Sequence, residues 1–223
     1  MKAKRILGVT LAAAMIFGVS IQVTAAELPA SKGNPVSALT IRADKNFMLT
    51  NEELPELIKT APDITETRSA ATIPDRPMTE AEIAAWTEEY WELGGINAFE
   101  LEMVRLINIE RENIGLHPLA VNPNLMVAAR FHSTKMADLQ FFNHRSPHHG
   151  RATNRAELFG HENIQEGFWG VGENLAGGTR SPDAVVQAWM NSPGHRAAIL
   201  QDFYLTIGIG AVQGGGTTAK FGS

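Results

Sequence analysis

The feature that most constrains the fold of this chain is the absence of cysteine in a sequence that begins like that of an exported protein. Lys2, Lys4 and Arg5 precede an uncharged run over residues 6–26 that ends in small residues suited to cleavage. We therefore expect a signal peptide over residues 1–26 and a secreted, extracellular protein. Exported domains of modest size often depend on disulfide bonds. Here the fold must be held by the hydrophobic core alone, or by the core together with a bound metal.

The charge balance argues against two classes of partner. The chain carries a net charge of −5, and loss of the three basic residues of the leader would make it −8. A chain this acidic has no general electrostatic attraction to nucleic acid or to an anionic membrane surface. Beyond residue 26 no stretch is long and apolar enough to span a bilayer. We expect neither nucleic-acid binding nor a transmembrane helix after signal removal.

The segment over residues 27–78 differs in composition from the rest of the chain. It contains six of the eleven prolines and only one glycine, and its apolar residues are scattered. This pattern predicts a proline-rich linker or loosely attached arm. Thr50 and Glu53 have the spacing of a capping box, which predicts one short helix over about 51–59.

A folded domain is expected over residues 79–223, and it opens with a leading helix within 79–95. Thr79 and Glu82 form a capping box in front of this helix, and Gly94 and Gly95 end it. Apolar residues at spacings of three and four predict two longer helices, over about 98–113 and 123–140. Two shorter helices are expected to begin after Ser181 and Ser192, each with proline at its first position.

The last part of the domain reads as a pair of strands. Residues 205–212 alternate larger side chains with Gly208 and Gly210, which predicts a half-buried strand with little room on one face. Residues 217–221 can pair with it across the Gly214–Gly216 turn. Together with the helices, this predicts an α+β fold, an α–β–α sandwich with a small antiparallel sheet between helices.

Three residues stand out as candidates for a site, although they are far apart in the chain. His195 lies in the first turn of a helix, where the helix dipole favours a neutral imidazole able to bind a metal or accept a proton. His132 lies on the inward-facing apolar stripe of the 123–140 helix. Glu173 lies between glycines that allow close approach of other elements. Spacing alone leaves two interpretations open: a shared site, or three separate structural residues.

Other motifs give no sign of a known reaction. His161-Glu162 begins like a zinc-protease helix, but the second histidine of that motif is missing. Neither a phosphate-binding loop nor a nucleophile elbow occurs. Ser192 is expected to use its hydroxyl as a helix cap. His148 and His149 are interpreted as solvated loop residues.

Six segments in register resemble the bacterial branch of the CAP superfamily, which includes cysteine-rich secretory, antigen-five and pathogenesis-related proteins and is also called the SCP-like extracellular domain. The resemblance covers about residues 97–223. The segments that carry it are LINIERENIG at 106–115, ARFHSTKM at 129–136, FNHRSP at 142–147, GENLA at 172–176, AWMNSPGHRAAIL at 188–200 and IGIG at 207–210.

The resemblance implies a cleft that carries histidines and acidic residues and that holds a divalent metal, often zinc, in some members. It places His132, Glu173 and His195 in this cleft as the expected zinc ligands, with His144 and Asn174 supporting them through hydrogen bonds. Three protein ligands and a water suffice for zinc. The second acid of the family is absent from residues 189–195. No residue is assigned a catalytic role.

Three functions are compatible with this resemblance. The first is a non-enzymatic module that binds a lipid, cell-wall or protein ligand. The second is a zinc-dependent hydrolase, in which the metal would lower the pKa of a bound water. The third is a structural, envelope-associated domain whose cleft residues only link helices.

Overall fold

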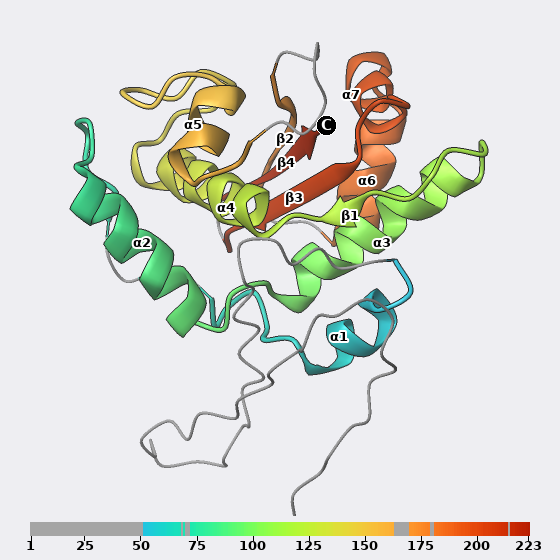
Figure 1. Cartoon of the computed structure of the whole chain (residues 1–223), viewed down its shortest axis with the longest axis horizontal. Helices are drawn as coiled ribbons and strands as arrows, with labels where there is room; N and C mark the ends of the chain where they lie inside the picture. Colours follow the sequence, from blue (N-terminus) through green and yellow to red (C-terminus); the bar gives the residue numbers. More distant parts are fainter. Residues whose placement is uncertain (1–50, 68, 70–71, 163–169, 179–180, 214) are drawn as a thin grey trace, which may run out of the picture.

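The computed structural model describes residues 51–67, 69, 72–162, 170–178, 181–213 and 215–223 (Figure 1). A small sheet lies between helices, so the predicted α–β–α sandwich of the α+β class is confirmed. The signal peptide predicted over residues 1–26 lies outside the described residues, as does Thr50. No helix in the described ranges is long and apolar enough to cross a membrane.

The sheet has four strands in the order β1-β3-β4-β2. The predicted pair is confirmed: β3 (Thr206–Ala211) runs antiparallel to β4 (Gly216–Gly222). Two strands were not predicted from the sequence. The first, β1 (Ala120–Val121), pairs in parallel with β3, and the second, β2 (Gly172–Gly177), runs antiparallel to β4 at the sheet edge. One is only two residues long and the other lies in a glycine-rich segment, so neither shows a clear alternating pattern.

Helix α4 (Pro123–Asp138) covers one face of β3 and β4. Two glycines of β3 make this close packing possible. A Cβ at Gly208 would clash with the backbone of Leu125, and one at Gly210 would clash with the backbone of Arg130. The prediction that one face of this strand has little room is therefore confirmed, but the prediction that the strand is half-buried was wrong. Every residue of β3 is buried, because the sheet is covered on both faces.

The opposite face of the sheet is covered by α3 (Ala98–Glu112), which packs against α6 (Pro182–Met190). The next helix, α7 (Pro193–Ile199), begins with proline as predicted. The predicted cap by the hydroxyl of Ser192 is wrong, because that side chain makes no capping hydrogen bond. A further helix, α5 (Ala152–Leu158), was not predicted from the sequence and packs against α4 and β2.

The described part of the proline-rich segment packs closely against the domain. It contains α1 (Leu54–Thr60), which lies against α3, and it leads into α2 (Glu80–Glu92). Leu54 and Ile73 are fully buried in the common hydrophobic core. The predicted capping box of Thr79 and Glu82 is present. The described residues between 51 and 78 therefore belong to the folded unit, in contrast to the predicted loosely attached arm.

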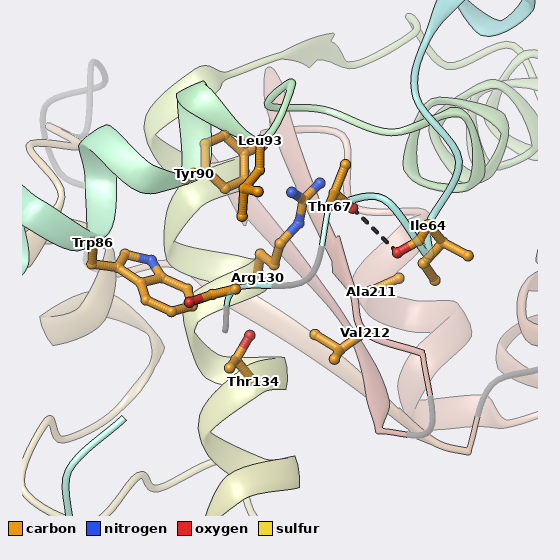
Figure 2. A pocket seen from close by; sticks show the side chains of 10 residues that line it. Ile64, Thr67, Trp86, Tyr90, Leu93, Arg130, Thr134, Ala211 and Val212 are labelled. Carbon is orange, nitrogen blue, oxygen red and sulfur yellow. Dashed lines mark hydrogen bonds between the residues drawn. The ribbon is translucent and has the colours of Figure 1, made fainter. Parts of the chain in front are cut away.

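A buried ion pair lies where α2 meets α4. The guanidinium of Arg130 pairs with Glu100, with Nε 2.8 Å from Oε1, and lies 4.4 Å from the ring centroid of Tyr90. Figure 2 shows Arg130 extending between Tyr90 and the segment that carries Thr67. The cavity beside it has a volume of about 10 Å³, enough for one water molecule. It is therefore too small to hold an organic ligand.

Candidate functional site

Glu173 is the centre of a buried ionic cluster at the edge of the sheet. It lies on β2 directly opposite Lys220 on β4. Its Oε2 atom is 2.7 Å from Nζ of Lys220 and 2.6 Å from Nη2 of Arg155, which comes from α5. Both cations are fully buried, and the Glu173 side chain is only 3% exposed. The glutamate that the family resemblance implies as a zinc ligand is thus enclosed by two positive charges.

The two cations decide the ionisation of Glu173. Burial alone raises the pKa of a carboxyl group, because it disfavours the charged form. The charge of Lys220, the hydrogen bond from His144 and the charge of Arg155 outweigh burial and hold the pKa of Glu173 well below its usual range. Burial lowers the pKa of Lys220 to about 8, against the opposing effect of Glu173. At neutral pH Glu173 is therefore ionised and firmly held.

His132 lies behind this cluster and has no access to solvent. Its Nε2 is 3.0 Å from the carbonyl oxygen of Asn143 and 3.9 Å from Oε1 of Glu173. Burial, followed by the charge of Arg155, lowers the pKa of His132 to about 3. The ring is thus neutral, and its Nε2–H donates to the Asn143 carbonyl. Its Nδ1 has no hydrogen-bond partner within the described residues.

His144 occupies the open side of Glu173. Its Nδ1 lies 3.1 Å from Oε1 of Glu173, and its side chain is 59% exposed. The hydrogen-bonding role expected for His144 is present in the structure. Because the ring is exposed while His132 is buried, His144 is the histidine that a molecule in solution can reach beside Glu173.

His195 lies near this cluster, in the first turn of α7, and is partly exposed. Burial and the nearby charge of His144 lower the pKa of His195. Its backbone oxygen accepts a hydrogen bond of 2.9 Å from Nδ2 of Asn174, the residue after Glu173 on β2. The structure thus brings His132, Glu173 and His144 into direct proximity, and it links His195 to them through Asn174.

The donor set does not fit the expected zinc ion. Among the described residues, no three His, Cys, Asp or Glu side chains are grouped so as to hold a metal. Glu173 already pairs with two cations, and a divalent ion on it would lie beside both of them and be repelled. Nε2 of His132 carries the hydrogen that it donates to Asn143, so this nitrogen has no free lone pair for a metal.

Two residues of the cluster, Arg155 and Lys220, were not predicted from the sequence. Arg155 gave no signal, because α5 was not predicted. Lys220 gave a weak signal in the sequence, since it is the single charged residue in β4, whose other residues are small or apolar. Had the pairing of β2 with β4 been recognised, the position of Lys220 opposite Glu173 would have revealed the ion pair.

The loop over residues 141–150, which carries His144, also frames an open hollow of about 690 Å³. Phe141, Asn143, Arg145 and His148 are among the residues that line it. His144 contacts Glu173, whereas the next residue, Arg145, lines the hollow. The residues that line the hollow therefore include the chain neighbours of His144, but neither His144 nor Glu173.

A three-layer sandwich with histidines around a glutamate at the sheet edge defines an SCP-like domain, the class that the sequence resembles. The chain matches the family described as "Cysteine-rich secretory protein family" (CAP) over residues 104–221. This match covers more than half of the chain, which therefore belongs to the CAP family.

Two relatives come from Bacillus subtilis. YkwD is 39% identical over 120 residues, which are 54% of this chain and 45% of YkwD. YlbC, described as a membrane protein, is 33% identical over 111 residues, which are 50% of this chain and 31% of YlbC. The chain thus spans less than half the length of these curated relatives.

A similar solved structure belongs to an extracellular protein of Bacillus anthracis that contains an SCP domain. It is 27% identical in sequence and superposes with a TM-score of 0.52, covering 66% of this chain and 44% of that one. This likeness agrees with the family assignment and with the α–β–α sandwich.

Proposed function

We propose that this CAP protein is an exported, non-enzymatic module that binds a ligand or partner at the surface formed by His144 and His195 beside Glu173. One observation carries the proposal: both oxygens of the Glu173 carboxylate are held by residues of the chain itself. A carboxylate fixed in this way orients His144 for recognition. His144 and His195 are the members of the site that are open to solvent.

The ionisation of the site supports binding over hydrolysis. A general base works best when its pKa lies near the working pH. The pKa of Glu173 lies well below its usual range, and that of His132 is lowered to about 3 inside the protein. A zinc-dependent hydrolase, the competing hypothesis, would need three metal ligands and an open position for water. Arg155 and Lys220 make that arrangement unfavourable at Glu173.

Export is the second part of the proposal. It is supported by the signal-peptide pattern over residues 1–26 and by the extracellular description of the Bacillus anthracis relative. The expected partners are those available outside a cell: a lipid, a cell-wall component or another protein. The structural, envelope-associated alternative shares this location but requires no exposed recognition surface.

Cosedimentation tests the binding proposal, with isolated bacterial cell walls in one arm and phosphatidylcholine vesicles in the other. We expect the chain to pellet with one of them, and a variant carrying His144→Ala and His195→Ala to remain in solution. A chain that pellets with neither favours the structural alternative. In parallel, p-nitrophenyl acetate is offered with and without zinc. Zinc-dependent turnover that disappears in Glu173→Gln would favour the hydrolase.

A further inference from the structure

The loop over residues 141–150 is held rigidly from below by three buried basic side chains. His132 contacts the carbonyl of Asn143 at 3.0 Å, and Lys135 donates to the carbonyl of Pro147 at 2.7 Å. Nη1 of Arg155 donates to two further carbonyls of the loop, those of residues 144 and 150, at 3.1 and 2.6 Å. All three basic side chains are completely buried. The hollow framed by this loop is therefore formed before any ligand arrives, which reduces the cost of binding.

The turn at the end of the loop is fixed in an unusual backbone conformation. His148 has a φ of 65°, a left-handed value that is uncommon for residues other than glycine. Ser146 pairs with Gly150 across the turn, with the Ser146 N–H 2.8 Å from the Gly150 oxygen. Strained backbone of this kind is found preferentially at functional sites. It places His148 at the wall of the hollow.

The charges around the hollow are mainly positive, although the chain as a whole is acidic. Arg145 is exposed, lines the hollow and forms no ion pair within the described residues. Lys135 and Arg155 add two buried positive charges behind the loop. On the negative side, Asp75 lies 3.2 Å from His148 at the rim, and Glu173 pairs with Arg155. The guanidinium of Arg145 is thus available to pair with an acidic group of a ligand.

The uncharged walls indicate what else the ligand carries. Phe141 and Pro147 supply apolar surface, while the exposed Asn143 supplies polar groups. The lining of the hollow combines apolar surface with polar groups, so a ligand of mixed character matches it better than a wholly apolar one. A sugar ring presents both an apolar face and hydroxyl groups, and the volume of about 690 Å³ lies in the usual range for small-molecule sites.

We infer that the hollow framed by residues 141–150 binds an acidic saccharide, a sugar that bears a carboxylate or a phosphate group. Arg145 pairs with the acidic group in a forked, charge-assisted contact. The sugar ring packs on Phe141 and Pro147, and Asn143 hydrogen-bonds to its hydroxyls. The net charge of the chain disfavours a long polyanion, so the hollow selects a single acidic group. The lining of this site does not include His144 or His195, and the inference goes beyond the function proposed above.

Titration of the full chain with three sugars tests the inference, with binding followed by ligand-observed NMR. Glucuronate offers a carboxylate, glucose 6-phosphate offers a phosphate, and glucose is the neutral reference. We expect at least one acidic sugar to bind about tenfold tighter than glucose, and Arg145→Gln to remove most of that preference. The better of the two acidic sugars identifies which acidic group the hollow prefers.

Arg151→Gln is the matched control, because Arg151 is an exposed arginine next to the same loop that does not line the hollow. We expect it to change affinity by less than about twofold, since an exposed charge that makes no direct contact with the ligand contributes little. His195→Ala should also leave sugar binding intact, so failure of the proposed function and failure of this inference are distinguishable. Binding of neither acidic sugar, equal binding of glucose, or equal losses in Arg145→Gln and Arg151→Gln would overturn the inference.

Discussion

Lys220 stands directly opposite Glu173 on the neighbouring antiparallel strand, and its Nζ lies 2.7 Å from Oε2 of Glu173. With Arg155 on the same oxygen, the carboxylate is neutralised from within the chain. A charge pair in this cross-strand position joins the edge strand β2 to the interior of the sheet. We infer that Lys220 and Arg155 occupy the electrostatic role that a metal ion would otherwise fill beside Glu173.

Replacement of Lys220 by methionine should destabilise the fold. Removal of one partner of a buried ion pair typically costs about 3–5 kcal/mol, and we expect the lower end because Arg155 still pairs with Glu173. The free energy of unfolding in urea measures this loss. Lys59→Met is the matched control, since Lys59 pairs with Glu56 in full exposure and should change stability by less than about 1 kcal/mol. Equal effects of the two changes would refute a structural role for Lys220.

Stability should fall as the pH is lowered from about 6.5. The pKa of His132 is about 3 in the folded protein against an ordinary value of 6.5, and that of His149 is lowered to about 4. Between these values the unfolded chain binds protons that the folded chain does not, so the stability that these two histidines contribute is complete above pH 6.5 and decreases below it. Glu173, whose pKa is depressed, adds a further loss below about pH 4.5.

His132→Gln should flatten this pH dependence between pH 6.5 and 4.5, because one of the titrating groups is removed. The measurement is the midpoint of urea unfolding at several pH values for the variant and the original chain. One such group contributes a slope of at most about 1.4 kcal/mol per pH unit. An unchanged slope in the variant would mean that His132 titrates normally and is not buried as described.

Gly210→Ala should be strongly destabilising. The added Cβ would clash with the backbone of Ala129 and Arg130 in α4, which cannot move aside like a flexible side chain. Overpacking of this kind typically costs about 1–3 kcal/mol. Gly194→Ala is the opposite case, because the new methyl group on α7 meets no atom within 4 Å and alanine favours a helix. Thermal unfolding should therefore show a lower Tm for the first variant and an unchanged or higher Tm for the second.

Leu54→Ala tests whether the segment that precedes the matched family region belongs to the folded unit. Leu54 is fully buried in the common core, so truncation of its side chain should cost about 2–5 kcal/mol. Leu57 on the same helix is only partly buried, and Leu57→Ala should cost clearly less. If Leu54→Ala unfolds in urea like the original chain, residues 51–60 are an attachment that the domain does not need.

Much of the fold could be predicted because its signals are local. The capping box at Thr79 and the prolines that open α6 and α7 act through their immediate neighbours in the chain, and the structure has them at the predicted positions. The two glycines of β3 are visible in the sequence as an alternating pattern, although the helix that packs on them, α4, is distant in the chain. Short elements with weak periodicity, such as β1, were missed. The packing of residues 51–78 was also missed, because burial of Leu54 depends on the distant helix α3, which composition does not reveal.

The site was only partly predictable for the same reason. The resemblance to the CAP family assigns His132, Glu173 and His195 to one cleft, with His144 and Asn174 supporting them. In the structure His144 contacts Glu173, Nε2 of His132 lies 3.9 Å from Oε1 of Glu173, and the backbone oxygen of His195 accepts a hydrogen bond from Asn174. The roles of individual side chains depend on partners from other elements. Arg155 and Lys220 turn Glu173 from an expected metal ligand into an ion-paired residue, and neither partner is adjacent to it in sequence.

Metal analysis by mass spectrometry, on protein purified without chelators, tests the central claim most directly. Because Lys220 and Arg155 neutralise Glu173, we predict less than stoichiometric zinc in the original chain at neutral pH. The opposite result would be one zinc per chain that is lost in both His132→Ala and His195→Ala. It would establish the zinc site expected from the family resemblance and contradict the internal ion pairing of Glu173.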